Sequence, residues 1–144
     1  MQRSGLERML QALVFEAGGL LIAVPLYEAV FSRATSEAMT LMVTLSLAVL
    51  IWTPLHNIAF DRIEHRLTGR SASDRPHALR CLHAISHEVS PIMVTLPLIL
   101  WVGQHSLSDA LALNLGLTLF YVGYAYVFYL IYDRLRPLPF TLMV

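Results

Sequence analysis

Glu16 and Glu88 each lie inside an apolar segment that is long enough to cross a bilayer. Glu16 lies in the apolar run 9–31, and Glu88 lies in the run 81–103. An acidic side chain at the centre of a membrane helix costs on the order of 2.5–3.5 kcal/mol on insertion scales, so such residues usually serve a function. Desolvation favours the neutral form of a carboxyl, whereas a nearby cation favours the charged form. A glutamate in this setting can therefore exchange a proton for a cationic ligand.

The two glutamates are equivalent positions of a tandem duplication. The sequence aligns with itself without a gap at an offset of 72 residues, the separation of Arg8 and Arg80, and this alignment extends from Arg8 to Glu64. Self-similarity at a fixed offset is the signature of a repeat architecture. The offset also pairs Ala12 with Ala84, Glu16 with Glu88, Pro25 with Pro97, Ala38 with Ala110, and Asp61 with Asp133.

The composition is that of an integral membrane protein. The 144 residues are 56% hydrophobic and 14% charged, with a mean hydropathy of +0.60, whereas soluble domains carry about a quarter charged residues. Four apolar runs, 9–31, 38–60, 81–103 and 110–132, reach the roughly 20 residues that a membrane helix needs. We therefore expect an all-α membrane protein with four transmembrane helices, arranged as two tandem parallel-repeat helical hairpins.

The halves are expected at residues 1–66 and 80–144, with a cytoplasmic connector at 67–79, in a single transmembrane domain. Each half contains two spans, so both copies enter the membrane in the same direction and are related by a pseudo-two-fold axis along the membrane normal. Thr68, Gly69, Ser71 and Pro76 make the stretch 62–80 the flexible part of the chain.

The arginines predict the orientation in the membrane. Nine of the ten basic residues flank the expected spans on one side, and only Arg33 lies on the other. The positive-inside rule then places both termini and the connector in the cytoplasm. Because these arginines follow the span ends rather than a basic face of a folded domain, nucleic-acid binding is not expected. We assign Arg8, Arg80, Asp61 and Asp133 to the membrane interfaces.

Polar and aromatic residues near the glutamates are candidates for a substrate cavity. Thr53, Asn57 and Asp61 share one helix face at i+4 spacing. The amide of Asn57 needs a partner at that depth, and either a helix-packing hydrogen bond or a ligand contact would satisfy it. Aromatic faces attract cations, best where water is excluded. We place Trp52, Asn57 and Tyr129, the equivalent of Asn57, at the substrate-binding cavity.

Histidines offer a second kind of chemistry. His83 and His87 have i, i+4 spacing, and with His56 they are compatible with metal or haem ligation in a helical bundle. However, no C-x-x-C-H motif is present, and the first copy has Gln11 and Phe15 at the equivalent positions. We therefore expect no metal site. A proton relay beside Glu88 is the preferred role for His83 and His87, and packing is preferred for His56.

At these residues the chain resembles the proteobacterial antimicrobial compound efflux transporters. In that family helices one and three open with R-x-x-H-A-x-x-F-E, helix two carries W-N-x-x-x-N-x-x-F-D, and helix four ends near Y-D-x-x-F-P. The corresponding segments here are Arg8-Met-Leu-Gln-Ala-Leu-Val-Phe-Glu16, Arg80-Cys-Leu-His-Ala-Ile-Ser-His-Glu88, Trp52-Thr-Pro-Leu-His-Asn-Ile-Ala-Phe-Asp61 and Tyr132-Asp-Arg-Leu-Arg-Pro137. Gln11, Thr53 and His87 depart from the pattern.

The resemblance implies a small bacterial inner-membrane protein that exports hydrophobic cationic biocides or short diamines. Export would be driven by the proton gradient without a cofactor, and Glu16 would couple it to protons. The partners would be a cationic substrate, protons and the lipid bilayer.

The alternative is a non-transporting membrane subunit, such as an assembly or haem-binding protein with structural buried acids. The sequence contains nothing that resembles a nucleophile triad or a phosphate-binding loop, so it gives little support to an enzyme. A four-helix chain has little interior for a cavity, so a homodimer is a plausible assembly.

Overall fold

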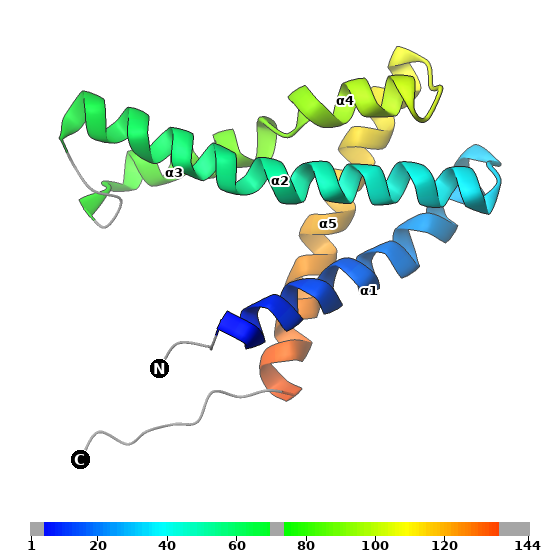
Figure 1. Cartoon of the computed structure of the whole chain (residues 1–144), viewed down its shortest axis with the longest axis horizontal. Coiled ribbons are helices and arrows are strands. Elements are labelled where there is room, and N and C mark those ends of the chain that lie inside the picture. Colours follow the sequence, from blue (N-terminus) through cyan, green and yellow to red (C-terminus); the bar gives the residue numbers. More distant parts are fainter. Residues whose placement is uncertain (1–4, 70–73, 136–144) are drawn as a thin grey trace. The chain divides into compact units, whose positions relative to one another are not determined.

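The chain is helical in the part that the structure describes. A computed structural model describes residues 5–69 and 74–135, except for the side chains of Gly5, Glu7, Arg8, Met9 and Asp133. These residues form helices α1 (Gly5–Phe31), α2 (Thr35–Thr68), α3 (His77–Val89), α4 (Ile92–Trp101) and α5 (Leu107–Leu135) (Figure 1). No strand occurs among them, and the predicted all-α class is confirmed.

Four helical segments are long and apolar enough to cross a membrane. They cover Leu10–Phe31, Thr35–Thr68, His77–Trp101 and Leu107–Tyr132, and the third contains both α3 and α4. Large apolar side chains are exposed along each segment, including Leu21, Leu50, Met93 and Leu119. Because lipid tails are as apolar as leucine, such surfaces are stable against acyl chains. The predicted multi-pass membrane protein with four spans is confirmed.

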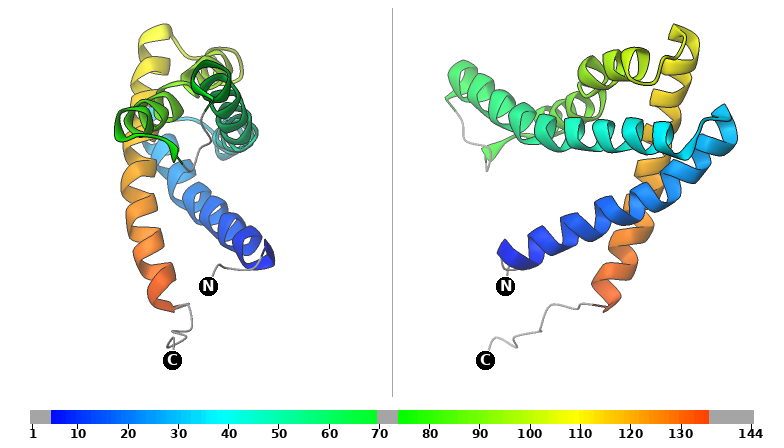
Figure 2. Two further views of the ribbon diagram at one scale, coloured as in Figure 1. Left: turned by 90° about the vertical axis from the view of Figure 1, so that its left-hand side faces the viewer. Right: turned by 45° about the vertical axis from the view of Figure 1, so that its right-hand side comes forward.

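The third span is broken just after Glu88. Helix α3 ends at Val89, Ser90 and Pro91 form a turn, and α4 begins at Ile92 (Figures 1 and 2). Proline has no backbone N–H and is well suited to the start of a helix. The first copy has Gly18 and Gly19 at these positions, and α1 continues through them because glycine keeps its N–H.

The connector is shorter than the stretch 62–80. Helix α2 continues to Thr68, where Gly69 adopts a φ of +69° and its amide donates to the carbonyl of His65 at 2.8 Å. A glycine in the left-handed region is a common way to end a helix. Helix α3 begins at His77. Within the described residues, 62–68 and 77–80 are therefore helical.

The duplication is visible in the backbone as well as in the sequence. Ser32 and Gln104, which are equivalent positions, both have a φ of 51°. Such a conformation is uncommon for residues other than glycine. The amides of Ala38 and Ala110 each donate to the carbonyl four residues earlier, at 3.0 and 2.9 Å. The two halves therefore use the same tight link between their helices.

The buried core follows the same offset. Ala38 and Ala110 are both fully buried, and small residues of this kind let neighbouring backbones approach closely. The other equivalent buried pairs are Ala23 with Thr95, Tyr27 with Ile99, and Leu41 with Leu113.

The helices group into two compact units that differ from the sequence halves. One unit contains Met1–Met39 and Leu115–Val144, and therefore α1 and most of α5. The other contains Thr40–Asn114, and therefore most of α2 with α3 and α4. Each unit thus combines helices from both halves of the sequence.

Candidate functional site

Glu16 lies half-buried on α1, in the unit that also contains most of α5. Its charge lies close enough to the side chains of Tyr121 and Tyr124 to act on both hydroxyls. The hydroxyl of Tyr124 donates a hydrogen bond to the carbonyl oxygen of Phe15 at 2.9 Å. The glutamate predicted from the sequence therefore lies within electrostatic range of two tyrosines of α5.

Phe15, which precedes Glu16 in the chain, is surrounded by aromatic side chains of α5. The centroid of Phe15 lies 4.9 Å from that of Tyr124, 5.2 Å from that of Phe128 and 5.8 Å from that of Tyr129. Tyr129 is exposed and stacks on Phe15 at an interplanar angle of 14°. Aromatic faces attract organic cations, and this cluster is built around the residue that precedes Glu16 in the chain.

Two glycines allow α5 to approach α1 at this point. A Cβ on Gly18 would overlap the hydroxyl of Tyr124, and a Cβ on Gly19 would lie 3.0 Å from Cε1 of Tyr121. Glycines can soften a helix, and the sequence has this pair just past Glu16. In the structure α1 is helical throughout, and the glycines make room for the two tyrosines.

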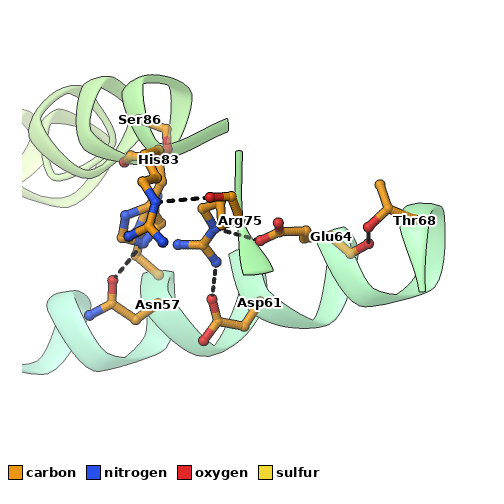
Figure 3. Close-up of polar contacts among 9 residues, drawn as sticks. Asn57, Asp61, Glu64, Thr68, Arg75, His83 and Ser86 are labelled. Atoms are coloured by element: carbon orange, nitrogen blue, oxygen red, sulfur yellow. Dashed lines mark hydrogen bonds and ion pairs between the residues drawn. The ribbon is translucent and has the colours of Figure 1, made fainter. Parts of the chain in front are cut away.

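Helices α2 and α3 meet through a row of polar contacts. The indole N–H of Trp52 donates to Oγ of Ser90 at 2.9 Å. His56 Nε2 lies 3.0 Å from Oγ of Ser86. Further along, Asn57 Oδ1 lies 3.0 Å from Nε2 of His83 (Figure 3). Trp52 and Asn57 therefore contact α3, while Tyr129 belongs to the other unit.

Three histidines gather at this interface. The ring centroid of His56 lies 5.4 Å from that of His83 and 5.5 Å from that of His87, and the last two lie 6.2 Å apart. No group of three or more His, Cys, Asp or Glu side chains in the described part of the chain is arranged to hold a metal ion. Sequence reasoning assigned His56 to packing and missed its hydrogen bond to α3.

The environments of Glu88 and Glu16 differ. The Glu88 side chain is 61% exposed, and its Oε1 lies 3.5 Å from Nδ1 of His87. Helix α3 uses His83 and Ser86, and the turn after it uses Ser90, for contacts with α2, so Glu88 lies outside that face. Equivalent positions in the sequence thus give two acids with different neighbours.

The contact of α1 with α5 and the contact of α2 with α3 nevertheless use equivalent positions. Phe15 and Phe128 meet edge-to-face at 5.2 Å and 82°, and their equivalents His87 and His56 meet at 5.5 Å and 79°. Likewise, Tyr124 reaches α1 beside Gly18, and its equivalent Trp52 bonds to Ser90, the equivalent of Gly18. The same contact is therefore built twice, once from aromatic and once from polar side chains. Comparing the copies at the offset of 72 is the sequence signal that could have identified these partners.

Arg75 holds the end of α2 next to α3. Its Nη2 lies 2.5 Å from Oδ1 of Asp61, and its Nε lies 2.6 Å from Oε2 of Glu64 (Figure 3). The guanidinium carbon lies 5.0 Å from the ring centroid of Phe60. The hydrogen bonds that Arg75 donates to Glu64 and Asp61 raise the pKa of its guanidinium above the usual value. Sequence reasoning named Asp61 as an interfacial residue and missed Glu64 and Arg75.

The remaining interfacial candidates are only partly described. Arg80 is exposed in the first turns of α3, and its Nε donates to the carbonyl oxygen of Arg75 at 2.9 Å. The side chains of Arg8 and Asp133 lie outside the described part of the structure.

Comparison with known protein families finds the same duplication. The family model described as "BTP: Chlorhexidine efflux transporter" matches the chain twice, over residues 3–66 and 75–138. The second match begins 72 residues after the first, which is the offset of the duplication. No solved structure matches the chain.

Curated relatives cover nearly the whole chain. A short-chain diamines transporter of Vibrio parahaemolyticus is 30% identical over 91% of both proteins. A second one, from Acinetobacter baumannii, is 28% identical over 90% of this chain and 87% of the relative. A third, from Acinetobacter baylyi, is 28% identical over 90% and 89%. Because the family match covers both halves, the chain belongs to the chlorhexidine efflux transporters, the proteobacterial antimicrobial compound efflux family.

Proposed function

We propose that this chain exports cationic amines across the bacterial inner membrane in exchange for protons. The substrate classes are short-chain diamines, which the curated relatives transport by name, and biguanides such as the chlorhexidine that names the family. Both classes are bases that carry positive charge at neutral pH. An acidic site surrounded by aromatic rings suits such molecules.

The observation that carries the proposal is the setting of Glu16. It lies within the apolar segment Leu10–Phe31, and Arg8 at the edge of that segment is about 12 Å away along the helix at 1.5 Å per residue. It is therefore too deep to reach the membrane surface easily. The side chains of Tyr121 and Tyr124 lie within electrostatic range of it, and Phe15, its neighbour in the chain, packs against Tyr124. Acidic residues in such positions commonly mark proton and substrate pathways.

Exchange at a single carboxyl is sufficient for coupling. A protonated Glu16 is neutral and gains little from a cation, whereas an ionised Glu16 attracts one. Cation binding therefore expels the proton, and reprotonation from the other side of the membrane expels the cation. The proton gradient supplies the driving force, and no cofactor is required. The termini and the connector face the cytoplasm in this scheme.

Transport in proteoliposomes tests the proposal. With an imposed pH gradient, the wild-type protein should move a short-chain diamine, and collapse of the gradient should stop the movement. Glu16→Gln keeps the size of the side chain but removes the titrating proton, so gradient-driven transport should be lost. Diamine affinity of the wild type in detergent should weaken as the pH is lowered, because protons compete for the same carboxyl.

Glu28→Gln is the matched control, since Glu28 lies on the same helix and is also half-buried. It should transport normally. Glu88→Gln should be milder than Glu16→Gln, because His83 or His87 can still carry a proton. Normal transport by Glu16→Gln, or a diamine affinity that is independent of pH, would show that this carboxyl is structural. A Soret band in the purified protein would favour the non-transporting haem protein instead.

A further inference from the structure

Arg75 is a buried cation held by three side chains of one helix. Its side chain is only 8% exposed, although it comes from the segment between α2 and α3 rather than from either helix. The three side chains that contact it, Phe60, Asp61 and Glu64, all lie on α2. Figure 3 shows the guanidinium between the two carboxylates. The helix thus presents a ready-made cation site, and the connector provides the occupant.

These three side chains suit a planar, delocalised cation. Carboxylates at two of its nitrogens and an aromatic ring within cation–π distance are the contacts that guanidinium groups favour in proteins. Biguanides share this planar, delocalised charge, and a diamine could satisfy the same carboxylates with ammonium groups. The cation site of Phe60, Asp61 and Glu64 is therefore chemically suited to the proposed substrates.

Arg75 leaves part of this site unused. The Glu64 side chain is 3% exposed, and its Oε1 has no hydrogen-bond partner among the described residues. A buried carboxylate oxygen without a partner is costly. A ligand with more N–H donors than Arg75 directs here could satisfy this oxygen.

The location of the site suits a molecule that arrives from one side of the membrane. Helix α2 has 34 residues and is about 51 Å long, whereas the hydrocarbon core is roughly 30 Å thick. Its last turns therefore extend beyond the core, on the side that carries nine of the ten arginines. Phe60 also contacts His83, with ring centroids 4.7 Å apart, so the site adjoins the polar interface of α2 and α3.

We propose that Phe60, Asp61 and Glu64 form a loading site for the cationic substrate, and that Arg75 occupies this site as an internal competitor until the substrate displaces it. This inference rests on the proposed export of cations and adds a second binding site to it. A tethered competitor lowers the apparent affinity in proportion to the fraction of time that it occupies the site. Removing the competitor should therefore tighten binding.

Binding of phenylbiguanide to purified protein in nanodiscs tests this idea. Arg75→Gln should bind the probe at least about fivefold more tightly than the wild type. Arg66→Gln removes the same charge from the exposed end of α2 and should stay within about twofold, which controls for the general loss of positive charge. The gain should disappear in Arg75→Gln combined with Glu64→Gln. An unchanged affinity in Arg75→Gln, or a gain that survives the loss of Glu64, would overturn the proposal.

A second measurement covers the case in which the loss of Arg75 unfolds the protein. Arg75→Ala leaves space for a free guanidinium, so millimolar methylguanidinium should raise its melting temperature. The same addition should not stabilise Arg75→Ala combined with Glu64→Gln. If methylguanidinium stabilises neither variant, Arg75 is only a structural clamp and the loading site does not exist.

Both measurements are independent of transport. Normal transport by the wild type, with no gain for Arg75→Gln, would remove the loading site and leave the proposed function standing. Tighter binding by Arg75→Gln, with no transport by the wild type, would keep the cation site and remove the export function.

Discussion

At the scale of single residues, the duplication keeps positions and changes their chemistry. Phe15 and Phe128 in one contact become His87 and His56 in the other, with nearly the same ring geometry. The first contact surrounds Phe15, which precedes Glu16 in the chain, with aromatic rings, and the second is built from two imidazole rings. The same helix contact is thus aromatic in one copy and polar in the other.

Close approach at Gly18 gives a prediction at this scale. Gly18→Ala should destabilise the protein by roughly 1–3 kcal/mol, the usual cost of overpacking, because the new methyl overlaps the Tyr124 hydroxyl. In a Tyr124→Phe background the hydroxyl is absent, and the same substitution should cost less. Thermal unfolding followed by circular dichroism measures both differences.

Gly123→Ala is the matched control, because a Cβ there meets no atom within 4 Å. It should change the melting temperature little. An equal cost of Gly18→Ala with and without the Tyr124 hydroxyl would contradict the overlap.

At the scale of elements, the first span of each half differs: it is one continuous helix in the first half and two helices in the second. Helix α1 passes through Gly18 and Gly19 without interruption, whereas Ser90 and Pro91 separate α3 from α4. The amide of Met93 bonds to the carbonyl of Ser90 at 3.1 Å, so α4 starts its own hydrogen-bond ladder. The turn lies directly after Glu88 and carries Ser90, the partner of Trp52.

The break depends on the missing N–H of Pro91 and on the clash of its ring with the preceding turn. Pro91→Ala should therefore join α3 and α4 into one helix. Hydrogen exchange followed by mass spectrometry should then show slower exchange of the amides at 90 and 92–94, the positions in this range that carry an amide hydrogen in both proteins. Pro97→Ala, inside α4, serves as the control and should leave these amides unchanged. If exchange at 90–94 is as fast in Pro91→Ala as in the wild type, the turn is set by other contacts.

At the scale of the whole molecule, the duplication and the charge distribution predict one topology. Two halves with two spans each place both termini and the connector on the same side of the membrane. Nine of the ten arginines flank the spans on that side, which the positive-inside rule identifies as the cytoplasm.

Reporter fusions test this topology. Fusions after residue 144 and between α2 and α3 should both report a cytoplasmic location, while a fusion at the link between α1 and α2 should report the outside. An external signal from the first two positions would invert the orientation. Opposite signals from those two would require an odd number of spans between them and would contradict the parallel repeat.

The sequence by itself determined the helices, the duplication and the family. The length of the apolar runs indicates which segments cross a membrane. The constant offset between the copies aligns Glu16 with Glu88 in the sequence. Pro91 lacks a backbone N–H, and the structure has a turn between two helices at Ser90 and Pro91. These features depend on local composition and on positions along the chain, so they can be read without the fold.

Only the tertiary structure decided which helix faces meet. A transmembrane helix is apolar on all sides because lipid surrounds it, so hydrophobic periodicity does not reveal its rotation or its partner. The bond from Trp52 to Ser90, the partners of Arg75 and the exposure of Glu88 all depend on that rotation. The pairing of Glu64 with Arg75 depends in addition on where α2 ends, at Thr68, just before the left-handed Gly69.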